Sequence, residues 1–198
     1  NIPNRINFTL NSSFKTLIYD NLELKDVQGR ITVRDNKVML NNLDMKLLDG
    51  SLSGSGYYAK SEYQTNPDIQ FNLEVKDFNI KQTYDKFVSV KQFAPIAQYM
   101  QGSFSSDLSM NTKLDASMMP LWETFFSKGL INLKSAEIKN FKPFTTVGSV
   151  LNLQELSNPK LQNVKPKFEI KNGRFYISPI EYKIGNYNVV LSGSNGLD

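Results

Sequence analysis

The sequence predicts an α+β fold that is mainly β: a curled antiparallel sheet of repeated meanders, with about three to four short helices packed on one face or end. Three observations lead to this prediction. One strand pattern occurs twice, at 31–56 and at 168–196. Apolar and polar residues alternate over most of the chain, which is the period of a half-buried strand. In a few short segments the apolar spacing changes to three or four, the period of a helix.

The repeat aligns without a gap over its first two strands, and a two-residue offset follows before the third. A turn separates the first two strands of each copy, formed by Asp35-Asn36 or by Asn172-Gly173, and both copies close on Ser-Gly-Ser. Each copy therefore predicts a meander with one apolar and one polar face, and it contains no reactive centre. The aligned apolar pairs are Ile31 with Phe168, Val33 with Ile170, Val38 with Phe175, Leu40 with Ile177, Leu43 with Ile180, Met45 with Tyr182 and Leu47 with Ile184.

Strands are predicted from alternation along the rest of the chain. The first is a half-buried strand around Ile6, Phe8 and Leu10. The others are expected near 30–35, 37–48, 51–59, 69–75, 102–114 and 130–138.

Helices are predicted where the period changes. Spacings of three and four between Ile80 and Met100 predict one or two short helices broken near Pro95. A further short helix is expected near 143–151, followed by a linker around Asn158-Pro159.

A third helix is predicted by an apolar stripe on the C-terminal side of Asp115 and Ser117, which are candidate caps. Packing on the sheet explains this stripe better than a membrane interface, because its one positive flank is Lys128. Trp122 would then be a buried anchor. The stripe consists of Met118, Leu121, Trp122, Phe125 and Phe126.

Composition narrows the possible functions. A chain of 198 residues with 40% hydrophobic content fits one domain, 1–198. It has no cysteine, which excludes disulfides and thiolate chemistry. It also has no histidine, the residue that most often serves as a general base and is a common metal ligand. We therefore expect no catalytic residue, no metal and no cofactor. The net charge of +4 is spread along the chain, and its few arginines (Arg5, Arg30, Arg34 and Arg174) form no cluster, so nucleic acid is not an expected partner.

Two motifs with a chemical meaning have simpler explanations. Gly54-Ser55-Gly56-Tyr57-Tyr58-Ala59 has the form of a dinucleotide fingerprint, but Lys60-Ser61-Glu62 and a proline loop follow it instead of a helix. These glycines are expected to mark a bend or bulge. Acid pairs such as Asp44 with Asp49, or Glu62 with Asp68, are expected to be solvated rather than catalytic.

Several segments together resemble the AsmA family of bacterial envelope proteins, from about Leu22 onward. They are glycine, asparagine and apolar motifs without catalytic residues: Leu48–Gly54, Pro67-Asp68-Ile69, Val75–Ile80, Gln101–Phe104, Lys128–Leu133, Ala136–Phe141, and Ile170–Arg174 with Ser192-Gly193-Ser194. The chain departs from the family where Ser194-Asn195-Gly196 replaces a further strand. We interpret this as truncation of a longer parent.

The resemblance implies a parent with an N-terminal inner-membrane helix and a periplasmic body of repeated β meanders. Such proteins carry phospholipid toward the outer membrane, with acyl chains on the apolar face of a curled sheet. The expected partners are then phospholipid, the membrane through a missing segment, and other envelope proteins. The lipid-binding candidates are Val38, Leu40, Leu43, Met45, Leu47, Phe175, Ile177, Ile180, Tyr182 and Ile184, all of which are equally good core candidates. The alternatives are an envelope scaffold without lipid and, less favoured, an enzyme that uses carboxylates alone.

Overall fold

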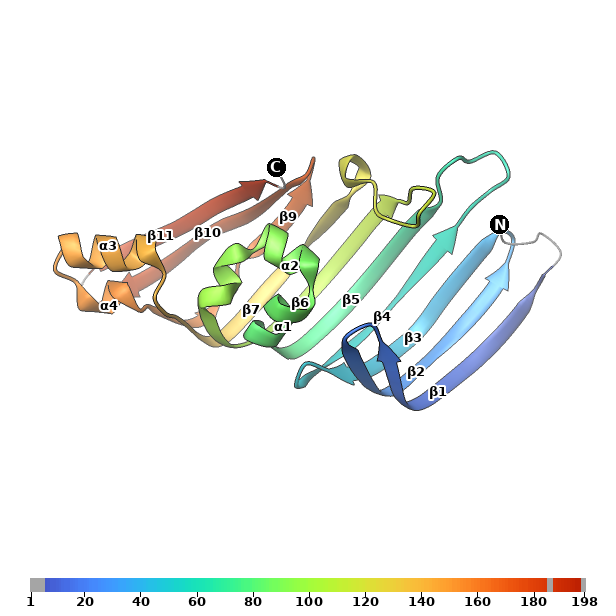
Figure 1. The fold of residues 1–198 in the computed structure, drawn as a ribbon, viewed down its shortest axis with the longest axis horizontal. Coiled ribbons are helices and arrows are strands. Elements are labelled where there is room, and N and C mark those ends of the chain that lie inside the picture. The colour runs from blue at the N-terminus through green and yellow to red at the C-terminus, as the bar shows by residue number, and fades with distance from the viewer. Residues whose placement is uncertain (1–5, 185–186, 197–198) are drawn as a thin grey trace.

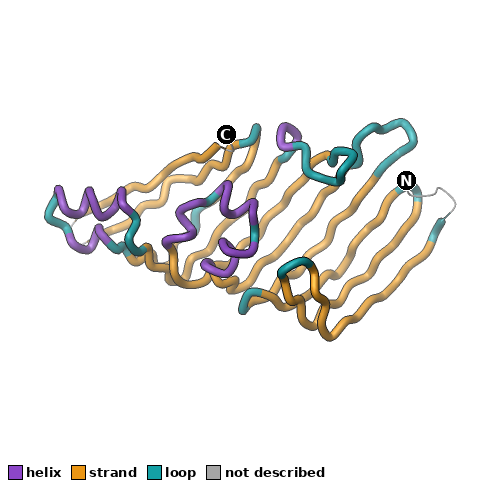
Figure 2. Tube along the Cα trace, in the orientation of Figure 1, coloured by secondary structure: helices purple, strands orange, loops and turns teal. Residues whose placement is uncertain are grey.

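The protein is an open antiparallel sheet that carries its helices on one face (Figures 1 and 2). The computed structural model describes residues 6–184 and 187–196. The predicted mainly-β antiparallel fold with short helices is confirmed. Its strands are β1 (Phe8–Tyr19), β2 (Leu22–Arg34), β3 (Lys37–Leu47), β4 (Gly50–Ala59), β5 (Asp68–Asn79), β6 (Met100–Lys113), β7 (Phe126–Ile138), β8 (Lys160–Val164), β9 (Lys167–Lys171), β10 (Arg174–Ile184) and β11 (Tyr187–Gly196).

Strands adjacent in the sheet are mostly adjacent in the sequence. The order is β1-β2-β3-β4-β5-β6-β7-β9-β10-β11, and β8 pairs with β7 beside β9. Every pairing is antiparallel. Among the described residues the α-helices lie in two connections, between β5 and β6 and between β7 and β8, and they do not change the strand order of the meander.

The segment between β5 and β6 forms three short helical pieces: α1 (Ile80–Lys86), α2 (Val88–Phe93) and the 3-10 helix η1 (Pro95–Tyr99). The Asn79 side chain caps α1 by accepting a hydrogen bond from the backbone N–H of Gln82. Phe87 is extended and separates α1 from α2, while Pro95 opens η1. The predicted break near Pro95 is confirmed, and a second break at Phe87 was not predicted.

The helix predicted over 118–126 is wrong. The segment is instead a long loop between β6 and β7 that contains a single 3-10 turn, η2 (Trp122–Thr124). The Asp115 carboxylate accepts hydrogen bonds from the N–H groups of Ser117 and Met119, which makes it a turn residue and not a helix cap. Met118 and Met119 are exposed, and Trp122 lies at the surface with 36% of its area exposed, not as a buried anchor.

The region after β7 contains more structure than expected. The predicted helix near 143–151 is α3 (Lys142–Val150), but α4 (Gln154–Ser157) and β8 were not predicted. The segment Asn158-Pro159 is no linker, because both residues bind the end of β7 and the turn after it. The Asn158 amide oxygen accepts from the N–H of Asn140, and the Pro159 carbonyl accepts from the N–H of Ile138.

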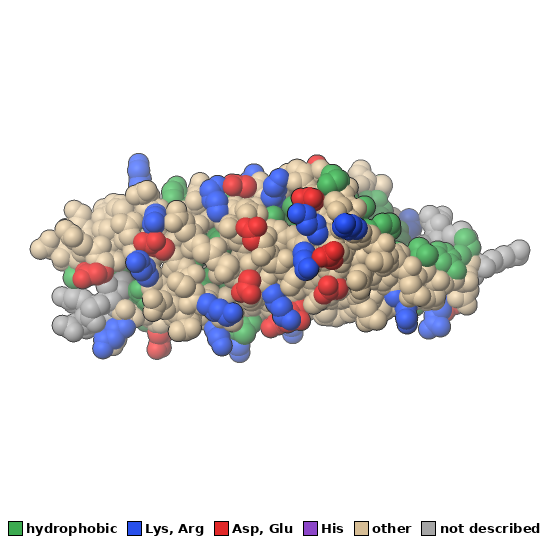
Figure 3. Space-filling model, turned by 90° about the horizontal axis from the view of Figure 1, so that it is seen from below, with side chains coloured by type: hydrophobic (Ala, Val, Ile, Leu, Met, Phe, Trp, Pro, Cys, Tyr) green, Lys and Arg blue, Asp and Glu red, His purple; other side chains and the backbone are tan. Residues whose placement is uncertain are grey.

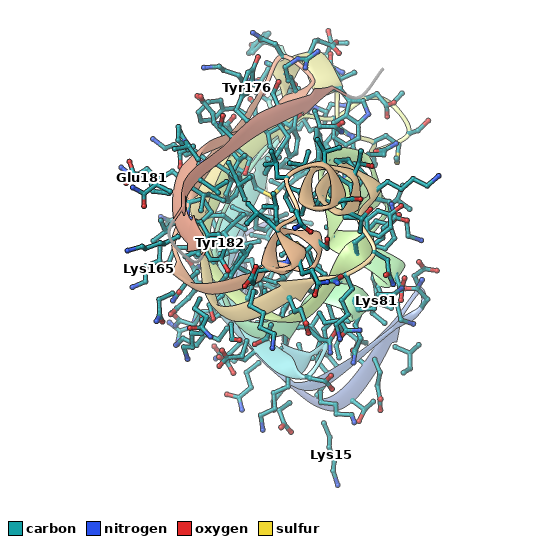
Figure 4. The ribbon with its side chains drawn as sticks, turned by 90° about the vertical axis from the view of Figure 1, so that its left-hand side faces the viewer. Lys15, Lys81, Lys165, Tyr176, Glu181 and Tyr182 are labelled. Atoms are coloured by element: carbon teal, nitrogen blue, oxygen red, sulfur yellow. The ribbon has the colours of Figure 1, made fainter. Side chains whose placement is uncertain are left out.

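Left-handed backbone conformations occur at the tight turns and at bulges within the strands. Asp35 and Asn36 both have positive φ in the β2–β3 turn, as do Asn172 and Gly173 in the β9–β10 turn. Asn42 has φ of 52° within a bulge of β3. Bulges of this kind bend a strand and increase its twist. Figure 4 shows the sheet bending around the helices.

The bulges of β3 and β10 lie at equivalent places in the two aligned segments. The β3–β4 register shifts between Leu40 and Leu43, and the β10–β11 register shifts between Ile177 and Ile180. These are aligned pairs of the sequence repeat. The two segments thus bend at matching positions.

The buried core lies between the sheet and its helices in two clusters. The first joins β2, β3 and β5 around Phe78, which is 4% exposed. The second joins α1 and η1 to β7 and β8 around Ile138.

Charges of both signs are interspersed over the side of the molecule that Figure 3 shows from below. Lys46 lies between the buried residues Met45 and Leu47 of β3 and so points to the outward face, opposite the helices. It donates a 2.8 Å hydrogen bond to Asp26, which lowers the pKa of Asp26 and raises that of Lys46.

Candidate functional site: an apolar inner face

The face of the sheet that carries the helices, here called the inner face, is largely apolar. Neighbouring strands place inner-face residues side by side in rows that cross the strands. One such row holds no charged residue: Leu10, Ile31, Leu40, Gly56, Phe71, Met110, Ser127, Ile170, Phe175 and Asn195. The next row reads Leu43, Gly54, Leu73, Leu108, Gly129, Phe168, Ile177 and Gly193. A hydrocarbon chain laid along these rows would meet no ion.

The glycines of these rows lie beneath larger neighbours. A Cβ on Gly56 would fall 2.1 Å from Cδ1 of Phe71, and one on Gly129 would fall 2.7 Å from Cε1 of Phe168. The ring of Phe71 therefore packs on the backbone of Gly56, and the ring of Phe168 packs on the backbone of Gly129. Gly193 is different, because a Cβ there would meet nothing within 4 Å. The expectation that Gly54 and Gly56 mark a bend or bulge is confirmed on the β3 side, where the register shifts between the pairs Leu40–Gly56 and Leu43–Gly54. On the other side β4 pairs with β5 in unbroken register.

The helices cover only part of the inner face. They lie over the middle and the β11 end of the sheet in Figure 1, whereas the β1 end lacks a helical cover. On β1 the side chains of Phe8, Leu10 and Phe14 remain 46%, 50% and 49% exposed. Val38 and Leu40 on β3 are half-buried. An apolar strip over β1–β4 is therefore open to solvent.

The structure divides the sequence-predicted residues into core and open positions. Met45 and Leu47 are buried in the first core cluster, and Leu43 packs against it. Ile180 and Tyr182 pack against the second cluster. Tyr182 lies inside the curve in Figure 4, whereas Glu181 points outward. These five residues thus serve the core of the fold.

The remaining candidates are more accessible. Val38, Leu40, Phe175 and Ile177 are half-buried on the inner face. The side chain of Ile184 lies outside the described residues. Val38 and Leu40 belong to the open strip, and they are the candidates that a ligand could reach without displacing a helix.

Two polar contacts hold the helical segment in place across the sheet. Lys86, at the end of α1, donates a 2.7 Å hydrogen bond to the Asn21 carbonyl in the β1–β2 turn. Asn195 of β11 donates a 2.7 Å hydrogen bond to the Gln92 carbonyl of α2. The α1–α2 segment is therefore tied to both ends of the sheet. This arrangement joins residues distant in sequence, which alternation could not predict.

An aromatic cluster closes the far end of the helical segment. Phe93 contacts Trp122 edge to face with ring centroids 5.7 Å apart, and stacks on Phe125 at 6.2 Å. A hollow of about 430 Å³ lies beside it, lined by Gln92, Trp122, Glu123, Asn172 and Gly173. The apolar stripe at 118–126 was the sequence signal for this cluster, although its helical interpretation is wrong.

A second hollow, of about 640 Å³, crosses the middle of the sheet. Its lining includes five residues of the second inner-face row, together with neighbouring charged residues such as Glu74, Asp107, Lys128 and Lys167. The five are Gly54, Leu73, Leu108, Gly129 and Phe168. The hollow therefore follows the second inner-face row and borders the open strip at Gly54 of β4.

Acidic residues show no arrangement for metal binding. Within the described residues no group of three or more acids could hold a metal ion. Asp49 accepts a hydrogen bond from Gln82, and Asp68 accepts one from Gln64 and pairs with Lys113 at 3.4 Å. Among the helices described, none is long and apolar enough to cross a bilayer. Comparisons with protein-family models, curated proteins and solved structures gave no match.

Proposed function

We propose that this chain is a non-catalytic, periplasmic domain of an AsmA-like protein, anchored in the inner membrane through its parent. It would act in phospholipid transport or outer-membrane assembly by binding acyl chains on the apolar face of a curled sheet of repeated meanders. The observation that carries the proposal is the open apolar strip over β1–β4. The family resemblance of the sequence supplies the cellular setting.

The open strip suits hydrocarbon better than a polar ligand. Its side chains offer no charge and few hydrogen-bonding groups in the rows that cross the strands. Each methylene removed from water contributes about 0.8 kcal/mol, so about ten methylenes would contribute roughly 8 kcal/mol before the costs of ordering. A large apolar surface left exposed on a soluble domain is typical of a binding surface.

The position of the strip suits a chain that enters from the side. Leu40 has Ile31 and Gly56 as its cross-strand neighbours, and Gly56, which has no side chain, lies against the ring of Phe71. An acyl chain could therefore lie across β2, β3 and β4 without moving a helix.

Replacement of Leu40 by asparagine tests the proposal. Leu40→Asn should weaken binding of a fluorescent acyl-chain probe about tenfold, because one aliphatic contact of roughly 1.5 kcal/mol is lost. Met39→Asn is the matched control: Met39 is the preceding residue of the same strand and lies on the outward face, opposite Thr32 and Tyr57. Its variant should bind as the wild type does. Equal affinities of the two variants, with both folded by near-ultraviolet circular dichroism, would contradict the proposal.

The second candidate function is an envelope scaffold that binds no lipid. The observation that favours it is the pair of terminal strands, β1 and β11, each of which has only one neighbour among the described residues. A scaffold would use these edges and leave the inner face empty. A wild-type chain that binds no acyl probe, but captures envelope proteins through an edge, would favour this candidate.

A further inference from the structure

The hollow beside the aromatic cluster brings together three segments that are distant in the sequence. Its lining comes from the end of α2 with Gln92, from η2 with Trp122 and Glu123, and from the β9–β10 turn with Asn172-Gly173. Its volume of about 430 Å³ lies within the range of pockets that bind small molecules. None of these residues belongs to β1–β4, so the hollow is separate from the open apolar strip.

Contacts outside the hollow hold its walls in place. Phe93 is 5% exposed, and its ring packs edge to face against Trp122. The backbone carbonyl of Gln92 accepts the hydrogen bond from Asn195. The turn Asn172-Gly173 has positive φ at both residues and joins β9 tightly to β10. A site with walls that are already ordered loses little conformational entropy when a ligand binds.

The polar groups of the hollow have no partners of their own. Within the residues that the structure describes, the Glu123 carboxylate and the Trp122 indole N–H make no hydrogen bond or ion pair. The same is true of the side-chain amides of Gln92 and Asn172 in that part of the chain. The carboxylate only accepts hydrogen bonds, the indole only donates, and the amides do both. A ligand here can therefore use both kinds of polar group.

We propose that this hollow binds a neutral oligosaccharide, with one pyranose ring stacked on the indole of Trp122. A pyranose ring combines a face of C–H groups, which packs on an aromatic ring, with hydroxyls that both donate and accept. Trp122 keeps 36% of its area exposed, so its ring is available for this contact. Sugar hydroxyls would donate to the Glu123 carboxylate and exchange hydrogen bonds with Gln92 and Asn172.

Charge and ring arrangement favour a sugar over other ligands that pack on tryptophan. Among the described residues that line the hollow Glu123 is the single charged one, so a nucleotide or another anion would meet a like charge. A quaternary ammonium group is typically bound by a cage of several rings. Here Phe93 and Phe125 pack on Trp122 and do not line the hollow. An acyl chain would leave the carboxylate and the amides without partners.

Fluorescence of the full 198-residue chain tests the site directly, because Trp122 is its single tryptophan. The probes are cellotetraose, maltotetraose and N-acetylated chitotetraose. At least one should change the emission saturably, with a Kd of about 1 mM or below. The same sugar should protect Trp122 from quenching by acrylamide, since the bound ring covers the exposed part of the indole.

Three variants separate the site from unspecific effects. Glu123→Ala should weaken sugar binding about tenfold, because a charge-assisted acceptor is lost. Glu155→Ala is the control, since it removes an exposed acid of α4 that does not line the hollow, and it should bind as the wild type does. Asn172→Gly should weaken binding about fivefold and keep the turn, because glycine readily adopts the φ of 52°.

The inference does not depend on lipid binding. Leu40→Asn should keep the full sugar response, and failure of the acyl probe to bind the open strip would leave it unchanged. Absence of a saturable response to all three sugars would overturn the proposal, as would equal affinities of folded Glu123→Ala and Glu155→Ala chains. Protection of Trp122 by the acyl probe in place of the sugars would also overturn it, because the hollow would then bind hydrocarbon.

Discussion

Gly56→Ala is expected to destabilise the protein by about 3 kcal/mol and to lower its melting temperature by roughly 10 °C. The added Cβ would lie 2.1 Å from Cδ1 of Phe71 and 2.4 Å from the Gln70 carbonyl oxygen. Rotating Phe71 would relieve the first clash, but the second involves backbone of the paired strand β5. Strands β4 and β5 would therefore have to separate locally, at a cost in ladder hydrogen bonds.

Gly193→Ala is the matched control for this prediction. Gly193 belongs to the corresponding Ser-Gly-Ser motif on β11, where a Cβ would meet nothing within 4 Å. Its replacement should change stability by less than about 1 kcal/mol, with alanine favoured by its lower backbone entropy. Urea denaturation of both variants makes the comparison. Equal stabilities would show that Phe71 does not rest on Gly56 as described.

Phe78→Ala is expected to cost about 4 kcal/mol, the largest effect of a single substitution that we anticipate. Phe78 is 4% exposed and forms the centre of the first core cluster. Its ring meets Phe104 edge to face with centroids 6.2 Å apart. Removal of the ring leaves a cavity in this cluster, beside the bulge at which the β5–β6 register shifts.

Tyr63→Ala is the control for loss of an aromatic side chain. Tyr63 is 97% exposed in the loop before β5, so its removal should change the unfolding free energy by less than about 0.5 kcal/mol. Chemical denaturation monitored by far-ultraviolet circular dichroism compares the two variants. If Phe78→Ala were as mild as Tyr63→Ala, the cluster around Phe78 would not be the core of the β2–β5 region.

Strands were predictable where the local pattern decides the structure. The alternation of Ile69, Phe71 and Leu73 with polar residues predicted a strand, and β5 forms there with one apolar and one polar face. The turns at Asp35-Asn36 and Asn172-Gly173 were predictable because these residue types accept positive φ. Such features depend on neighbours in the sequence.

The failed helix at 118–126 shows a limit of periodicity. The apolar spacing there arises because Trp122 and Phe125 both contact Phe93, a residue of α2. The backbone is meanwhile held in the loop by Thr124, whose hydroxyl oxygen accepts from the N–H of Lys113 at 2.9 Å. Tertiary contacts produced a helical spacing without a helix.

The accessible part of the inner face could not be predicted either. The sequence identifies Leu40 and Met45 equally as apolar strand residues, yet Met45 is buried against Phe78 while Leu40 stays half-buried. The difference depends on where the β5–β6 helices fold back over the sheet. That position is set by distant contacts such as the hydrogen bond between Asn195 and Gln92.

Native mass spectrometry of the chain, purified gently from bacterial membranes, is the most direct test of the central claim that the inner face binds acyl chains. Lipid binding predicts a stoichiometric phospholipid adduct on the wild type that is retained by Met39→Asn and lost from folded Leu40→Asn. A reproducibly lipid-free wild type, or an adduct that Leu40→Asn retains in full, would contradict the claim and favour the scaffold.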